Sequence, residues 1–144
     1  MGRMVLNLLE LRLEAAYRTG GVHALLANLA SVRPLEWDVR PLNPSSNEFG
    51  NDPELSIRDI VVHVGGCKYM YADHGFNGDS LKWGIIDGWG NIYPPSDEME
   101  AVLAWLEEGH RVFMEAVATL RDDAELAVDR MAPWRRPLRT EQII

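Results

Sequence analysis

The stretch Ser56-Ile57-Arg58-Asp59-Ile60-Val61-Val62-His63-Val64-Gly65-Gly66 carries the strongest helix signal in the chain. Ser56 can accept hydrogen bonds from the free amides of a first helical turn. Asp59, three residues later, completes an arrangement like a capping box, and the helix dipole favours its negative charge. Spacings of three and four then place five apolar side chains on one stripe: Ile57, Ile60, Val61, Val64 and Tyr71. The sequence predicts an amphipathic helix from residue 56 to about residue 73, with this stripe buried.

Helical periodicity also dominates on both sides of this stretch. Residues 4–18 carry apolar side chains at threes and fours, Gly20-Gly21 interrupts them, and a second stripe runs from residue 22 to Pro34. A third helix is predicted to begin at Ser96 and to continue for about seven turns to Leu120. No segment reads as a clear alternating strand, so the expected fold is an all-α, up-and-down helix bundle in one domain.

Two long connections separate the predicted helices. Residues 33–55 are rich in proline and serine, whereas residues 75–95 combine glycines with aromatic and aliphatic side chains. Loops of this length are unusual inside a compact domain. The aromatic content of residues 83–93 predicts that the second connection folds back over the domain as a cover.

Composition limits the classes of partner. The chain has 144 residues and a net charge of −8, which argues against a nucleic-acid binder because such proteins need a basic face. A single cysteine excludes a disulfide scaffold and a thiolate zinc cluster, and it is typical of a reducing cytoplasm. No apolar run approaches the roughly 20 residues of a membrane span. We expect a cytoplasmic domain that acts on a small molecule or binds another protein, and neither nucleic acid nor a membrane.

The last residues have the form of a further helix start. Thr140 is a suitable N-cap residue, Glu141 places an acid in the first turn, and two isoleucines follow. A start signal without a helix behind it leads us to expect a further helix that this chain does not contain. A frayed natural tail is the alternative.

The predicted helix at residues 56–73 carries the candidate site. His63, Cys67, Met70 and His74 form one flank of its apolar stripe, so His63 lies at the border of the core. A neutral imidazole there can face a pocket and bind a metal, although a border histidine is more often a hydrogen-bonded packing residue. His63 and His74 are about 16 Å apart along a straight helix, too far to share one ion.

Other residues are candidates for the same pocket, which we expect to include Cys67, Tyr71, His74 and His110. His110 falls on the third predicted apolar face, either as an inward polar group or as a core histidine. Cys67 is either a soft ligand or nucleophile, or a small residue that fills a tight helix contact. Gly65-Gly66 lies inside a helix with no strand before it, so close packing is a better interpretation than phosphate binding.

Taken together, these residues resemble the DinB-like proteins. The specific part is the stretch from Ser56 to Gly66 with its continuation Tyr69-Met70-Tyr71-Ala72-Asp73-His74, which looks like the second helix of that family. The connection containing Glu36-Trp37 and the helix from Ala101 to Leu120 followed by Asp122-Asp123 also fit. The resemblance covers residues 8–144. It implies a four-helix bundle with a divalent metal, which is zinc, nickel or iron, in its core.

The resemblance also implies three histidine ligands, one on the second helix and two on the last helix as His-x-x-x-His. His63 matches the first, but the chain contains no His-x-x-x-His pair. The other two ligands are therefore expected on the C-terminal helix that is missing here. Characterised relatives include thiol-dependent S-transferases, in which the metal is thought to stabilise the thiolate of a low-molecular-weight thiol.

Two functions follow as hypotheses. The first is a metal-dependent thiol S-transferase with a small-molecule substrate, with His63 as a ligand and residues 83–93 lining or covering the cleft. The second is a non-catalytic helical binding module without a functional metal site. In that case the uncovered apolar stripes would be closed by a second copy, as a homodimer.

Overall fold

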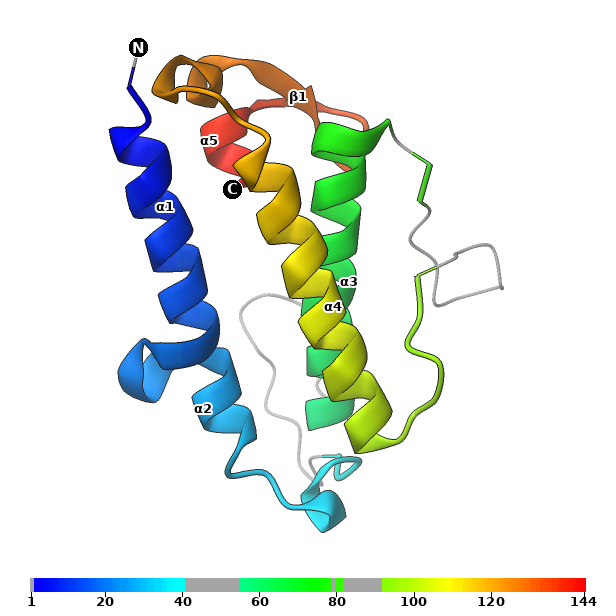
Figure 1. Cartoon of the computed structure of the whole chain (residues 1–144). Coiled ribbons are helices and arrows are strands. Elements are labelled where there is room, and N and C mark those ends of the chain that lie inside the picture. Colours follow the sequence, from blue (N-terminus) through cyan, green and yellow to red (C-terminus); the bar gives the residue numbers. More distant parts are fainter. Residues whose placement is uncertain (1, 41–54, 79, 82–91) are drawn as a thin grey trace.

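The computed structural model describes residues 2–40, 55–78, 80–81 and 92–144 (Figure 1). Its helices are α1 (Met4–Glu14), α2 (Leu25–Leu29), α3 (Ile57–Ala72), α4 (Met99–Ala118) and α5 (Thr140–Ile143). Two short antiparallel strands, β1 (Asp129–Met131) and β2 (Pro137–Arg139), form a hairpin. Single π-helical or 3-10 turns cover Ala15–Thr19, Gly21–His23, Pro34–Glu36, Asp73–Asn77 and Asp123–Ala127. The described part is mostly helical, as predicted, and the hairpin was not predicted.

Helix α3 begins as the sequence predicts. The Asp59 amide donates to the Ser56 hydroxyl at 3.2 Å, and the Ser56 amide donates to the Asp59 carboxylate at 3.0 Å. These two bonds satisfy amides that a helix start leaves unpaired. The predicted capping box is therefore confirmed.

The predicted buried stripe of α3 is confirmed only in part. Val61 is buried, and Ile57, Val64 and Tyr71 are half-buried. Ile60 has 51% of its surface exposed, so its predicted burial is wrong. The reason is the position of α4, which packs on the face of α3 that contains Val61 and Gly65. Ile60 lies about 100° around the helix from Val61 and faces away from that contact.

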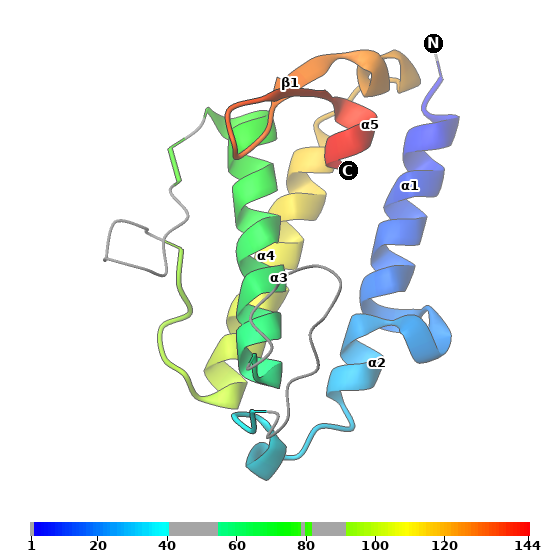
Figure 2. The same cartoon turned by 180° about the vertical axis from the view of Figure 1, so that it is seen from behind.

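A pair of glycines allows α3 and α4 to approach closely. A Cβ atom added at Gly65 would lie 2.3 Å from the Trp105 ring, and one added at Gly109 would lie 2.8 Å from the Tyr69 ring. The Tyr69 hydroxyl also donates to the Trp105 carbonyl at 3.1 Å. The predicted close packing at Gly65 is confirmed, and the two helices lie side by side in both cartoon views (Figures 1 and 2).

Helix α1 lies across from the α3–α4 pair, and α1 and the π-helical turn after it each contribute to one of two buried clusters. One cluster contains Leu6, Ala72, Phe113, Ala116, Val117, Leu120 and Leu126. The other contains Tyr17, Leu29, Trp37, Val61, Val102 and Leu106. The first turn of α1 is fixed by Asp123, whose carboxylate accepts from the amides of Val5 and Leu6 at 3.1 and 2.9 Å. A carboxylate at that helix end is favoured by the dipole.

The hairpin leads into α5 at the same end of the molecule as the start of α1 (Figures 1 and 2). Thr140 is buried and donates its hydroxyl hydrogen to the Val128 carbonyl at 2.8 Å. The predicted helix start is confirmed, although Arg139 occupies the cap position and Thr140 is the first helical residue.

Two further expectations meet different outcomes. Helix α4 begins at Met99 rather than Ser96, because Ser96 accepts from the Glu98 amide at 3.3 Å in a bend that precedes the helix.

The cover predicted at residues 83–93 cannot be compared with the structure over residues 83–91, which lie outside the described residues. No helix in the described ranges has the length and apolar content needed to cross a membrane.

Candidate functional site

His63 is exposed on α3 and lines two neighbouring cavities. The first cavity, of about 420 Å³, is otherwise lined by Cys67, Met70, Tyr71, Pro133 and Trp134. The second, of about 460 Å³, is otherwise lined by Arg40, Leu55, Arg58, Asp59, Val62, Tyr93, Pro94 and Asp97. His63 thus stands between a mostly apolar cavity and a charged one.

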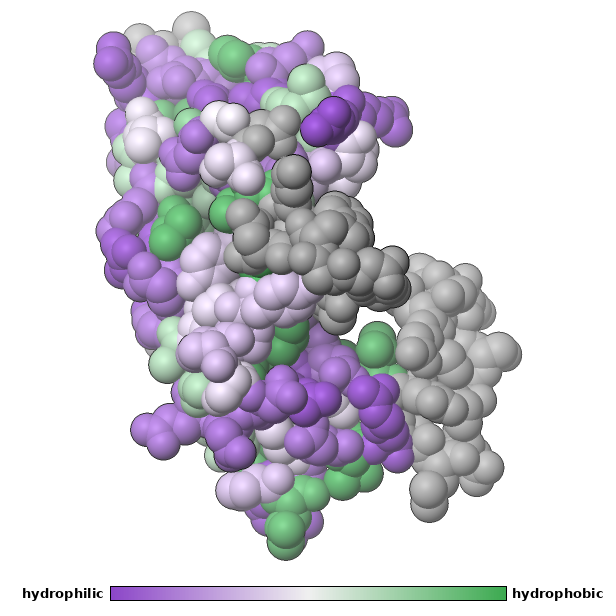
Figure 3. Space-filling view, turned by 90° about the vertical axis from the view of Figure 1, so that its right-hand side faces the viewer, coloured by the Kyte–Doolittle hydropathy of each residue, from purple (hydrophilic) through white to green (hydrophobic). Residues whose placement is uncertain are grey.

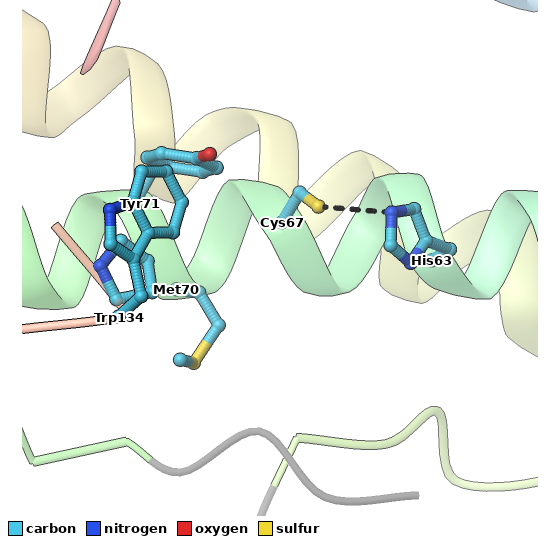
Figure 4. A pocket seen from close by; sticks show the side chains of 6 residues that line it. His63, Cys67, Met70, Tyr71 and Trp134 are labelled. Atoms are coloured by element: carbon cyan, nitrogen blue, oxygen red, sulfur yellow. Dashed lines mark hydrogen bonds between the residues drawn. The ribbon is translucent and has the colours of Figure 1, made fainter. Parts of the chain in front are cut away.

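The apolar cavity is built by α3 and the turn of the hairpin. Cys67, Met70 and Tyr71 follow His63 along α3, while Pro133 and Trp134 come from the turn between β1 and β2. The Trp134 and Tyr71 rings meet edge to face, with centroids 5.9 Å apart. Figure 4 shows the two rings together at one end of the group and the His63 ring at the other. An aromatic wall of this kind suits a substrate with an apolar part.

Cys67 lies between these two ends. Its sulfur points toward the His63 ring, and Sγ is 3.6 Å from Nε2 (Figure 4). Burial raises the pKa of the Cys67 thiol, and the nearby Lys68 charge lowers it to a smaller extent. The thiol is therefore protonated at neutral pH and is a weak nucleophile on its own.

The charged cavity is held by ion pairs. Arg58 lies 3.0 Å from Asp38 and 3.4 Å from Asp97, and Arg40 lies 2.8 Å from Asp59. Asp59 also belongs to the capping box of α3, so its position is fixed from two sides. These pairs tie the start of α3 to the residues before α4.

The other histidines do not line the two cavities beside His63. His74 is buried in the π-helical turn after α3, with Nε2 2.9 Å from the Leu81 carbonyl oxygen. His110 is buried on α4, and His23 is exposed at the end of a 3-10 turn before α2. Of the four residues expected in one pocket, Cys67 and Tyr71 line the cavity beside His63, whereas His74 and His110 do not. His74 is separated from it because it lies eleven residues after His63, beyond the end of α3 at Ala72.

His110 belongs to a buried polar cluster between α1, α3 and α4. Its Nε2 is 2.8 Å from a Glu14 carboxylate oxygen, its Nδ1 is 3.1 Å from the Lys68 ammonium nitrogen, and its ring stacks on Tyr17 with centroids 3.8 Å apart. An ammonium group only donates, so Nδ1 accepts and Nε2 carries the proton. Burial lowers the pKa of His110, while the bond to Glu14 acts in the opposite direction. His110 is a neutral, hydrogen-bonded core histidine.

This cluster continues to the surface through charged partners. The Tyr17 hydroxyl donates to Glu107 at 3.0 Å, and Arg18 pairs with both Glu14 and Glu107. The hydrogen bond to His110 is the main reason that the pKa of Glu14 lies below its ordinary value. Tyr17, Arg18, Glu14 and Glu107 are therefore linked to one another at the edge of the cluster.

Sequence reasoning missed Trp134, Pro133 and the roles of Glu14 and Lys68. Trp134 follows Pro133 in a short segment that carried no periodic signal, and only the hairpin brings it over α3. Glu14 is 96 positions from His110, so no local spacing could connect them. Across the described ranges, no group of three or more His, Cys, Asp or Glu side chains is arranged to hold a metal ion.

On the side of the molecule shown in Figure 3, hydrophobic residues form small separate areas among hydrophilic ones.

Comparison with known proteins assigns neither a family nor a function: no family model, curated protein or solved structure matches the chain.

Proposed function

We propose that this chain is a metal-binding helical protein of the DinB-like type, with His63 as one ligand of a divalent cation. The observation that carries the proposal is the position of His63, exposed on α3 at the edge of a cavity of about 420 Å³. A histidine at this place on the second long helix is what the resemblance implies. Zinc, nickel and iron are the expected metals.

The three-histidine set implied by the resemblance does not fit the described residues. His110 is bonded through both ring nitrogens to Glu14 and Lys68, and His74 is buried with Nε2 beside the Leu81 carbonyl. Further ligands would therefore come from Cys67, from solvent or from groups outside the described residues. The activity class that we propose is thiol S-transfer, and the chain's own contribution is an apolar pocket with the Tyr71 and Trp134 rings in its wall.

Metal stoichiometry tests this proposal. The purified chain is dialysed separately against zinc, nickel and cobalt, and bound metal is measured by elemental analysis. One equivalent of metal is expected, and His63→Ala is expected to lose it. His23→Ala is the matched control, because His23 is also exposed but lies outside both cavities. Absence of stoichiometric metal, or equal binding by His63→Ala, contradicts the proposal.

A second candidate function is a non-catalytic interaction module that pairs with a second copy. A specific observation favours it: Met4, Leu8 and Leu11 are exposed by 80%, 54% and 69% and share one face of α1. Spacings of four and three form a helical stripe, and α1 lies at the outer side of the molecule (Figures 1 and 2). Two copies could cover the stripe with a two-fold α1–α1 contact.

Sedimentation equilibrium separates this candidate from the first. A dimer that becomes monomeric in Leu8→Glu/Leu11→Glu is expected if the stripe is an interface, and both positions are exposed enough to accept a charge. A monomer at every concentration removes the candidate and leaves the metal proposal unaffected.

A further inference from the structure

Trp134 is held at the apolar cavity by the turn of the hairpin. The Arg135 amide donates to the Ala132 carbonyl, and the Ala132 amide donates to the Arg136 carbonyl, both at 2.9 Å. Pro133 restricts the backbone at the second position of this turn, and Arg135 follows with a left-handed φ of 58°, as is common in three-residue hairpin loops. Ala132 is buried, whereas Trp134 has 53% of its surface exposed. The backbone of the turn, more than burial, therefore sets the position of the Trp134 ring.

The two aromatic rings leave flat surface available at this cavity. Trp134 and Tyr71 meet edge to face, with centroids 5.9 Å apart and an interplanar angle of 83°. A contact of this kind covers at most one face of one ring, so aromatic surface remains for a ligand. Met70, which is buried, and Pro133 add further apolar surface to the lining. An aromatic ring can pack on such a surface by offset stacking or by a second edge-to-face contact.

The charge of the lining restricts the ligand further. The described lining of this cavity contains no Asp, Glu, Lys or Arg, whereas the second cavity beside His63 is lined by two arginines and two aspartates. Burial raises the pKa of the Cys67 thiol, which is therefore uncharged at neutral pH. A charged group that entered the apolar cavity would lose hydration without gaining an opposite charge. The lining thus favours an uncharged ligand.

We propose that the cavity between α3 and the β1–β2 turn binds an uncharged aromatic small molecule, whose ring packs against Trp134. The volume of about 420 Å³ lies within the usual range of small-molecule sites. Figure 4 shows Trp134 and Tyr71 at one end of the group and His63 at the other, with Cys67 between them. The inference rests on the proposed function for treating this molecule as a substrate, but its binding requires no metal.

A matched pair of fluorescent probes tests the inference. Phenylnaphthylamine is uncharged and aromatic, and its fluorescence rises in apolar surroundings; anilinonaphthalene sulfonate has the same rings and a negative charge. The full chain is titrated with each probe in the presence of a metal chelator. Trp134→Ala and Trp134→Phe are titrated in parallel, with circular dichroism to verify folding. Tyr93→Ala is the control, because Tyr93 is also an exposed aromatic residue but lines only the second cavity.

The expected result is saturable binding of one equivalent of phenylnaphthylamine. Trp134→Ala should bind it about tenfold more weakly, because a packed ring is lost, whereas Trp134→Phe should keep most of the affinity and Tyr93→Ala all of it. The sulfonate probe should bind the parent chain at least about tenfold more weakly. Absence of saturable binding, equal affinity in Trp134→Ala, or equal affinity for the two probes overturns the inference. None of these results alters the metal stoichiometry at His63, which tests the proposed function separately.

Discussion

Two histidines on facing helices of the same packed pair occupy opposite environments. His110 on α4 is 2% exposed, stacked on Tyr17 and bonded through both ring nitrogens. His63 on α3 is exposed, lies between two cavities and contacts the Cys67 sulfur. The first imidazole is fixed inside the core by its bonds, whereas the second lies at the surface beside two cavities. The different environments of His110 and His63 therefore follow from the groups that surround each ring and not from the residue type.

The largest expected effect comes from removing the buried ring. His110→Ala should lower the free energy of unfolding by about 2–4 kcal/mol, because it leaves a cavity and removes partners from Glu14 and Lys68. His63→Ala should change it by less than about 0.5 kcal/mol, as an exposed substitution. Urea denaturation of both variants measures the difference. Similar values for the two variants would remove the distinction between them.

The close contact between α3 and α4 at Gly65 provides the next test. Gly65→Ala should lower the free energy of unfolding by about 1–3 kcal/mol, because the added methyl group meets the Trp105 ring and overpacks the α3–α4 contact. Thermal melting with Gly2→Ala as control measures this, since nothing lies within 4 Å of a Cβ atom at Gly2. A stabilising effect, as helix propensity alone predicts, would show that the two helices separate easily.

The His110 cluster should also make stability depend on pH. The pKa values of His110 and Glu14 are both lowered in the fold, the first mainly by burial and the second mainly by the bond to His110. Between about pH 6.5 and 4 the unfolded chain therefore binds more protons, so the free energy of unfolding falls as the pH falls through this window. Denaturation midpoints at four pH values should show this slope, and His110→Gln should flatten its upper part. A slope equal to wild type in His110→Gln would contradict the assignment.

The smallest effect concerns Cys67. Because burial raises its pKa, its reaction with iodoacetamide at pH 7.5 should be several times slower than that of glutathione; a shift of one pKa unit lowers the thiolate fraction about tenfold. The pH dependence of the alkylation rate gives the thiol pKa directly. A rate at or above that of glutathione would show that the thiol is activated.

The sequence predicted the parts of the fold that depend on local spacing. Ser56 and Asp59 mark the start of α3 through bonds between residues three apart, and the glycine at position 65 indicated close packing. Ile60 was misplaced, because periodicity defines a stripe but not which edge of it α4 covers. The hairpin was missed, since strands of three residues are too short to show alternation.

In the candidate site, too, local contacts could be predicted and contacts between distant residues could not. His63 and Cys67 are four residues apart on one helix, so their proximity could be read from the sequence. Trp134 reaches the cavity only because the hairpin folds over α3, and Glu14 reaches His110 only because α1 packs against α4. The DinB-like assignment and the thiol S-transferase activity remain proposals.

The most direct test of the account is nuclear magnetic resonance of the histidine side-chain nitrogens, recorded at pH 7.5 with and without zinc. The account predicts that one equivalent of zinc shifts the Nε2 resonance of His63 and leaves the resonances of buried His110 and exposed His23 unchanged. An unchanged His63 resonance at one equivalent of zinc would contradict the claim that this residue is a metal ligand.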